Sequence, residues 1–295
     1  MAEKIGIIAG SRAYDLRQEM AQAGWEVGAL QAVGTPFGPS SPMGQARVRG
    51  QEAVLVSRHG AEGYSIAAPF VNYRANVYAL KDQGVTRIIA WSGPGAIDDT
   101  LQIGQLVIPA DIIDETRRRE STFYEGTGLG FIRSHPVFCP QVAAAARVAI
   151  GGELGRDARE DLVYVCTEGP RLETAAEVRR YRLFGAHLVG MTLAPEAFLA
   201  RELEMCYAAI CYVTNYAEGV RETPYRPGEL FEGMVTPAEK QAAEAAVRRL
   251  PAVVAATVER LTQAPRTCHC HETMRRYKLR GDIGEDWREW IKRPS

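Results

Sequence analysis

The chain has 295 residues, 46% of them hydrophobic, and a formal net charge of -1 from 35 Lys and Arg against 36 Asp and Glu. The balanced charge offers no global field for nucleic acid or an anionic membrane, so neither is an expected partner. The first apolar stretch, residues 5–9, is too short for a signal peptide, and no run approaches the roughly 20 apolar residues that cross a bilayer. We therefore expect a globular, cytoplasmic protein.

Short apolar runs alternate with helical stretches along the chain. Strands are predicted at 5–9, 53–56, 87–91, 106–108, 162–166, 188–189 and 208–213. A helix over 75–83 is predicted to end before Gly84, and another over 175–184 before Gly185. This alternation predicts an α/β domain with a central mixed β-sheet flanked by helices.

Stretches rich in Gly, Pro and Ser predict the loops. The stretches 34–50 and 216–233 are expected to be loops, and the second could act as a lid. Thr236-Pro237-Ala238-Glu239 is a capping box that opens an Ala-rich helix. We expect Pro251 to kink or divide that helix.

No repeat or low-complexity linker divides the sequence, so a single domain over 1–262 is predicted, followed by a C-terminal tail over 263–295. The tail contains Cys268-His269-Cys270-His271, for which zinc is the first interpretation. Alternating neighbours rarely all point at one ion, and structural zinc sites usually use wider ligand spacing, so no metal site is predicted. A reduced, merely structural set of thiols stays open as an alternative.

Three predicted strands end in turns that could bind an anion. The first strand runs into Gly10-Ser11, where glycine permits close backbone approach and a hydroxyl is at hand. Arg58-His59 follows the second strand and Ser92-Gly93 follows the third. The second and third glycines of a dinucleotide fingerprint are absent after the first strand, so the pattern favours phosphate over a dinucleotide.

Three further strand ends give way to polar or Gly/Pro-rich sequence. They are the segments Thr167 to Thr174, Gly190-Met191-Thr192 and Thr214-Asn215-Tyr216-Ala217. Such strand ends carry the ligand groups of α/β folds, so one pocket is predicted.

In this order the motifs resemble those of the trimeric purine nucleoside phosphorylase and S-methyl-5′-thioadenosine (thioinosine) phosphorylase family, from Lys4 to about Thr236. The resemblance implies a nucleoside phosphorylase-like fold with a partly barrel-like sheet. It also implies a pentosyltransferase that cleaves a purine nucleoside or 5′-methylthio-purine nucleoside with phosphate, giving free base and (methylthio)ribose-1-phosphate. Phosphate is then a co-substrate, no cofactor or metal is needed, and a homotrimer or a dimer of trimers is expected.

The resemblance also implies a role for each matching residue. For phosphate binding these are Ser11, Arg58, His59, Ser92, Gly93 and Thr192. For base and ribose they are Leu172, Glu173, Met191, Asn215 and Ala217. Asn215, Glu173 and His59 are the expected catalytic residues, and Phe131 is expected to reach the site of a neighbouring subunit.

Glu173 and Asn215 match the branch of the family that cleaves 6-oxopurines, whereas the aminopurine branch typically has Ser and Asp there. Ala217 stands where that second branch has a further Asp. Thr192 is instead the form found in the methylthio-nucleoside branch. The combination would suit methylthioinosine, with inosine or guanosine as rivals.

Alternatives stay open at this point. One is an adenine-specific methylthioadenosine phosphorylase and another is a nucleosidase that uses water. A third is a nucleoside-binding protein without turnover, suggested by Arg12 and Ala13 where the family often has another glycine. Some thermophilic members form disulfides through a C-terminal Cys-x-Cys, which makes Cys139, Cys206 and Cys211 candidate partners for the tail cysteines.

Overall fold

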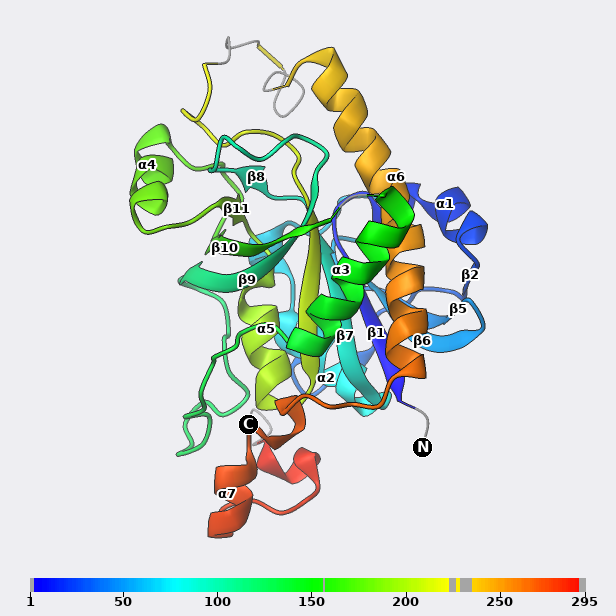
Figure 1. Cartoon of the computed structure of the whole chain (residues 1–295). Coiled ribbons are helices and arrows are strands. Elements are labelled where there is room, and N and C mark those ends of the chain that lie inside the picture. Colours follow the sequence, from blue (N-terminus) through cyan, green and yellow to red (C-terminus); the bar gives the residue numbers. More distant parts are fainter. Residues whose placement is uncertain (1–2, 156, 223–226, 229–234, 292–295) are drawn as a thin grey trace.

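The computed structural model describes residues 3–155, 157–222, 227–228 and 235–291 (Figure 1). The strands are β1 Lys4–Ala9, β2 Trp25–Val27, β3 Gly34–Thr35, β4 Gly38–Pro39, β5 Met43–Val48, β6 Gln51–Ser57, β7 Val85–Ser92, β8 Gly95–Ala96, β9 Leu106–Glu115, β10 Arg159–Thr167, β11 Leu188–Gly190 and β12 Cys206–Tyr212. The α-helices are α1 Arg17–Gln22, α2 Tyr73–Asp82, α3 Pro140–Leu154, α4 Ala175–Leu183, α5 Leu193–Glu202, α6 Pro237–Gln263 and α7 Arg275–Arg280.

One mixed sheet organises the part of the chain that the structure describes. Its strand order is β2-β5-β6-β1-β7-β12-β9-β10-β11-β8, and β3 pairs separately with β4. Strands β6, β1, β7 and β12 run parallel to one another, so their carboxyl ends share one edge. Strand β9 runs antiparallel to β12 and parallel to β10, which in turn is parallel to β11.

The connection from β7 to β8 curls this sheet. Only Gly93 and Pro94 separate the two strands along the chain, yet β8 pairs with β11 at the far edge, with β12, β9, β10 and β11 between β7 and β8 in the sheet order. The sheet therefore folds back on itself and is partly barrel-like. This curl brings the ends of β10 and β11 to the ends of β7 and β12.

All seven predicted strands are present as β1, β6, β7, β9, β10, β11 and β12, and the helices predicted before Gly84 and Gly185 are α2 and α4. The predicted loop over 34–50 is wrong over β5. All six residues of β5 pair with β6. The apolar side chains of Met43, Ala46 and Val48 are interspersed with exposed or half-buried ones and pack into the core, which stabilises the strand. Most of the second predicted loop, including 223–226 and 229–234, lies outside the described residues.

Helices α3 and α6 lie side by side across the sheet (Figure 1). The capping box at Thr236 is confirmed, with the Thr236 hydroxyl accepting from Glu239 N at 3.3 Å and the Glu239 carboxylate accepting from Thr236 N at 2.8 Å. The helix is not divided at Pro251 but continues to Gln263. Leu250 and Val253 beside the proline are fully buried, and their packing outweighs the one backbone bond that proline removes.

Beyond α6 the chain folds back against the domain, at the lower end of Figure 1. Met274, Tyr277 and Trp290 are buried in the same apolar core as the sheet. Lys278 Nζ binds Glu204 at 2.8 Å. No helix among the described residues is long and apolar enough to cross a membrane.

Gly190 is required by the packing of β11 on β10. A Cβ at Gly190 would lie 2.0 Å from the hydroxyl oxygen of the fully buried Tyr164. We expect Gly190→Ala to lower the free energy of unfolding by about 1–3 kcal/mol through overpacking. Gly152→Ala, in the exposed face of α3 with nothing near its Cβ, should raise it by about 0.5–1 kcal/mol. Denaturant titration measures both, and equal stability of the two variants would contradict the packing argument.

Candidate functional site

A cavity of about 570 Å³ lies where the strand ends meet. The predicted residues that line it are Ser11, Arg58, His59, Ser92, Gly93, Leu172, Glu173, Met191, Thr192, Asn215 and Ala217. They come from the ends of β1, β6, β7, β10, β11 and β12. Among the predicted site residues only Phe131 is not in this lining.

Arg58 stands at the end of β6 and is fully buried. Its Nε and Nη2 donate to the two carboxylate oxygens of Glu196 at 2.5 and 2.9 Å, and its Nη1 donates to Trp91 O at 3.3 Å. Tyr207 Oη also donates to Glu196, at 2.7 Å. Burial alone would lower the pKa of Arg58, but the charge and hydrogen bonds of Glu196 raise it, so the guanidinium stays charged beside the cavity.

His59 follows Arg58 and is held by one hydrogen bond and one ring contact. Nδ1 lies 2.8 Å from Ile66 O, which can only accept, so Nδ1 carries the proton and Nε2 is bare in the neutral ring. Tyr64 stacks on the imidazole with ring centroids 4.5 Å apart. Burial and then the charge of Arg58 lower the pKa of His59 to about 4.

A group of hydroxyls lies at the end of β7. Ser92 Oγ is 3.2 Å from Thr192 Oγ1 and 3.3 Å from the Tyr164 hydroxyl. Ser92 and Thr192 belong to segments 100 residues apart, which the curl of the sheet brings together. A hydroxyl suits an anion because it donates a hydrogen bond to the anion oxygen and carries no negative charge of its own.

Glu173 lies in the segment after β10 and lines the same cavity. The Thr167 hydroxyl donates to its Oε1 at 2.5 Å, and only 9% of Glu173 is exposed. Burial raises the pKa of Glu173, while the Thr167 hydroxyl opposes that shift. Glu173 is thus a hydrogen-bond acceptor with one carboxylate oxygen already engaged.

Asn215 follows β12, and its amide orientation is set by neighbours. Nδ2 donates to Tyr216 O at 2.8 Å, and Oδ1 accepts from the Thr214 hydroxyl at 2.6 Å. The backbone is tied as well, because Thr214 N donates to Pro94 O at 3.0 Å and Ala96 N donates to Asn215 O at 2.8 Å. The amide therefore stands beside the connection from β7 to β8.

The site combines a cradle of hydroxyls and a buried guanidinium with a carboxylate and an amide, around a space of the size that holds small ligands. Residues 4–258 match the phosphorylase superfamily. The chain belongs to this superfamily. Within it, the protein is a pentosyltransferase of the purine nucleoside or methylthioadenosine phosphorylase type, acting on a nucleoside and phosphate.

Individual relatives of this phosphorylase carry different names. It is 40% identical over 233 residues, 78% of both chains, to a probable S-methyl-5′-thioinosine phosphorylase of Methanothermobacter thermautotrophicus. It is also 40% identical over 238 residues, 78% of this chain and 86% of the other, to the 6-oxopurine nucleoside phosphorylase of Pyrococcus furiosus. A crystal structure of a methylthioadenosine phosphorylase from an Antarctic soil metagenomic library superposes with a TM-score of 0.77 at 29% identity, covering 92% of this chain and 91% of that one.

The sequence did not reveal Arg119, which organises the backbone after β10 and β11. Its side chain is 1% exposed and donates to four carbonyl oxygens, those of Thr167, Glu168, Met191 and Ala194, at 3.1, 2.7, 2.6 and 2.8 Å. Arg119 thereby fixes the backbone where the chain leaves β10 and β11. Arg119 is the last of three consecutive arginines, and no sequence signal separates it from its two exposed neighbours.

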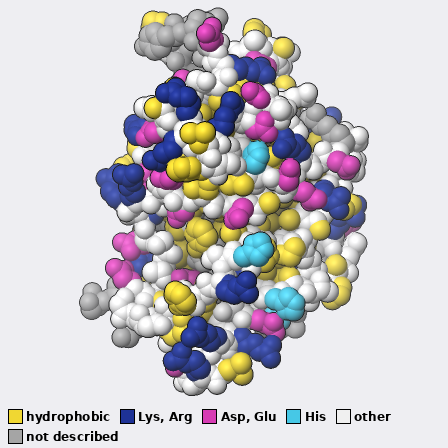
Figure 2. Space-filling model, turned by 60° about the vertical axis from the view of Figure 1, so that its left-hand side comes forward, with side chains coloured by type: hydrophobic (Ala, Val, Ile, Leu, Met, Phe, Trp, Pro, Cys, Tyr) yellow, Lys and Arg dark blue, Asp and Glu magenta, His cyan; other side chains and the backbone are white. Residues whose placement is uncertain are grey.

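Helix α6 also contributes to the lining. Lys240, Ala243, Glu244 and Val247 face the cavity. Tyr14 and Tyr64 are further additions. Figure 2 shows one face of the molecule with a band of hydrophobic side chains bordered by charged ones.

Phe131 is 85% exposed. Its backbone N–H donates to the Tyr277 hydroxyl at 2.9 Å. A contribution of Phe131 to a neighbouring subunit's site stays a prediction.

The Arg58 to Glu196 pair should be essential for stability. Glu196→Gln leaves a buried guanidinium without its counter-charge, and we expect a loss of about 3–5 kcal/mol in the free energy of unfolding. Tyr207→Phe removes one donor to the same carboxylate and should cost about 1.5–3 kcal/mol. Chemical denaturation of both variants checks this order, and a Glu196→Gln protein as stable as the parent would contradict it.

The lowered pKa of His59 predicts a pH dependence of stability. The unfolded state takes up a proton near pH 6.5 and the folded state only near pH 4, so this stability is complete above pH 6.5 and is lost as the pH falls toward 4. Between these values the parent should lose about 2–3 kcal/mol more than His59→Asn, which cannot titrate there. Denaturant titrations across this pH range measure the difference, and parallel curves would rule out the buried neutral imidazole.

Proposed function

We propose that this phosphorylase cleaves 6-oxopurine nucleosides and prefers 5′-methylthioinosine. The observation that carries the proposal is the contact of the Thr167 hydroxyl with Glu173 Oε1 at 2.5 Å. That donor favours the ionised carboxylate and leaves the other oxygen as an acceptor. An acceptor matches the N1–H of hypoxanthine or guanine, whereas adenine would set a bare N1 lone pair against it, an unsatisfied contact that costs about 1–3 kcal/mol.

Asn215 supports the same base preference. Its Nδ2 donates to Tyr216 O and its Oδ1 accepts from the Thr214 hydroxyl, so the amide is held in one orientation in the cavity lining. In our proposal N7 takes a proton from solvent as the glycosidic bond breaks, so the base leaves as a neutral purine. The amide Nδ2 donates to O6, where negative charge develops, and Oδ1 accepts from the N7–H so formed.

The phosphate side follows from the remaining lining residues. In our proposal Ser11, Ser92, Gly93 and Thr192 donate to phosphate oxygens, and the phosphate hydroxyl donates to the bare Nε2 of His59. The bound phosphate attacks C1′ of an oxocarbenium-like sugar, so positioning contributes most of the catalysis. Arg58 acts mainly through its positive field, since Glu196 engages its Nε and Nη2.

The apolar part of the lining supports a 5′-methylthio group. Val235, Ala243 and Val247 face the cavity near the start and along the first half of α6. A thioether gains from contact with these apolar carbons. The names of the relatives, which include thioinosine and 6-oxopurine phosphorylases, agree with this assignment.

We also propose that the chain works as a homotrimer or a dimer of trimers. Phe131 is 85% exposed and lies outside its own cavity, as a residue that serves a neighbouring site would. Sedimentation velocity tests the assembly, and a monomer at assay concentration would overturn it.

A substrate comparison tests the proposed function. Release of free base from methylthioinosine, inosine, methylthioadenosine and adenosine is measured with and without phosphate. We expect phosphate-dependent cleavage, with kcat/KM for each oxopurine substrate about 10–100-fold above its aminopurine counterpart. A preference for methylthioadenosine would overturn the base assignment, and release without phosphate would indicate a nucleosidase.

Two variants test which residues determine the preference for oxopurine substrates. Asn215→Asp turns the donor at O6 into an acceptor suited to an exocyclic amino group, so the oxopurine to aminopurine ratio should fall about 10-fold or more. Glu173→Gln should lower the same ratio by removing the carboxylate that receives N1–H. Leu183→Ala, at an exposed position in α4 away from the lining, serves as the control and should leave the ratio unchanged.

A further inference from the structure

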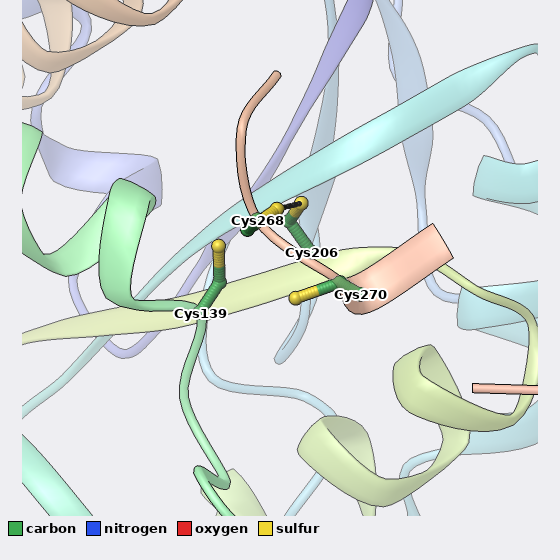
Figure 3. Close-up of side chains that lie close together, drawn as sticks. All are labelled: Cys139, Cys206, Cys268 and Cys270. Atoms are coloured by element: carbon green, nitrogen blue, oxygen red, sulfur yellow. Dashed lines mark hydrogen bonds between the residues drawn. The ribbon is translucent and has the colours of Figure 1, made fainter. Parts of the chain in front are cut away.

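Four cysteine sulfurs gather at a second place in the molecule. Cys139, Cys206, Cys268 and Cys270 are all buried, and their sulfur atoms all lie within 4.8 Å of one another. They come from the residue before α3, the first residue of β12 and the segment after α6, and their side chains converge on one point (Figure 3). None of them lines the cavity described above.

The spacing of the sulfurs fits a tetrahedral ion. Zinc binds thiolate sulfur at about 2.3 Å, which places the sulfurs of a regular tetrahedron about 3.8 Å apart. The closest contact between Cys206 and Cys268 measures 3.3 Å, and no separation exceeds 4.8 Å. Each sulfur thus has the other three as neighbours, rather than one partner at bonding distance.

The sequence argument against zinc assumed that alternating residues point in opposite directions. The chain instead turns at His269, with φ of -92° and ψ of 15°, and enters a short 3-10 helix at Cys270. Both cysteines therefore point inward, while the His269 side chain is 88% exposed and contacts Glu272. The motif provides two thiol ligands and no imidazole ligand.

The surroundings suit thiolates. Cys139 precedes the 15-residue helix α3, whose amino end favours negative charge, and the backbone of Val142 hydrogen-bonds its sulfur. Arg266 lies against Cys206 and Cys268, and its buried Nε has no hydrogen-bond partner among the described residues. A thiolate sulfur is a better acceptor for such a donor than a thiol is. Zinc with four thiolates carries a net charge of -2, which nearby cations offset.

We propose that Cys139, Cys206, Cys268 and Cys270 bind one zinc ion that fastens the C-terminal segment to the starts of α3 and β12. Binding releases the four thiol protons to solvent and changes no oxidation state. Four protein ligands fill a tetrahedral site and leave no position for substrate, so the site is structural. The assignment does not depend on which nucleoside the cavity cleaves.

Metal and thiol counts on the full chain test the proposal. The protein is purified without chelator or added metal, zinc is measured by elemental analysis, and thiols are counted after denaturation with a chelator but no reductant. We expect one zinc per chain and all six cysteines as free thiols. Fewer than six thiols without zinc would show that disulfides form in the cluster, and six thiols without zinc would show a reduced cluster that binds no metal. Either result would overturn the proposal.

Cysteine variants test whether the zinc is bound by the four-cysteine cluster. Cys268→Ser and Cys270→Ser should lose most of the zinc and melt at lower temperature, while Cys211→Ser makes the same change at a buried cysteine outside the cluster and should keep it. Should the cluster variants fail to fold, cobalt substitution of the parent gives an independent readout. Intense visible bands of tetrahedral cobalt with sulfur charge transfer are expected, and octahedral cobalt bands would overturn the assignment.

Discussion

The buried ion pair of Arg58 and Glu196 is the interaction on which the rest of this phosphorylase depends. It joins the turn after β6 to α5, and through Trp91 O and the Tyr207 hydroxyl it reaches β7 and β12. Removing two charges from water is costly, and the hydrogen bonds to Trp91 O and from the Tyr207 hydroxyl help to offset that cost. The pair holds the Arg58 guanidinium beside the cavity in a single orientation. Burial and then the same charge lower the pKa of His59 and keep its imidazole neutral.

The cavity lining contains two chemically different parts. The part at the ends of β1, β6 and β7 offers hydroxyls and the Arg58 guanidinium, groups that suit an anion. The other part offers the Glu173 carboxylate and the Asn215 amide, which hydrogen bonds with Thr167, Thr214 and Tyr216 orient. In the proposed reaction such oriented groups need no reorganisation when charge develops on the base. Arg119 keeps the backbone after β10 and β11 in place without touching the cavity.

Much of the fold and lining could be predicted because apolar runs ending in Gly, Ser or Pro are local signals, as at Ser92-Gly93 and Asn215. The sequence contains no such local signal for residues whose contacts are distant along the chain. Glu196 is 138 residues from Arg58, and Arg119 resembles its exposed neighbours in composition. Strand β5 was obscured by surrounding glycines and prolines, and the direction of Cys268 and Cys270 depends on a turn that the Cys-x-Cys spacing alone does not show.

The short link of Gly93 and Pro94 between β7 and β8 has a consequence for the range of substrates. One end carries Ser92, and the other is bonded through Pro94 O and Ala96 N to the segment of Asn215. In the function proposed above, Ser92 contacts the attacking phosphate and Asn215 the departing base, so this short link keeps the two groups at a set separation. Side chains elsewhere in the lining can differ without altering that separation, which suits substrates that share a furanose ring.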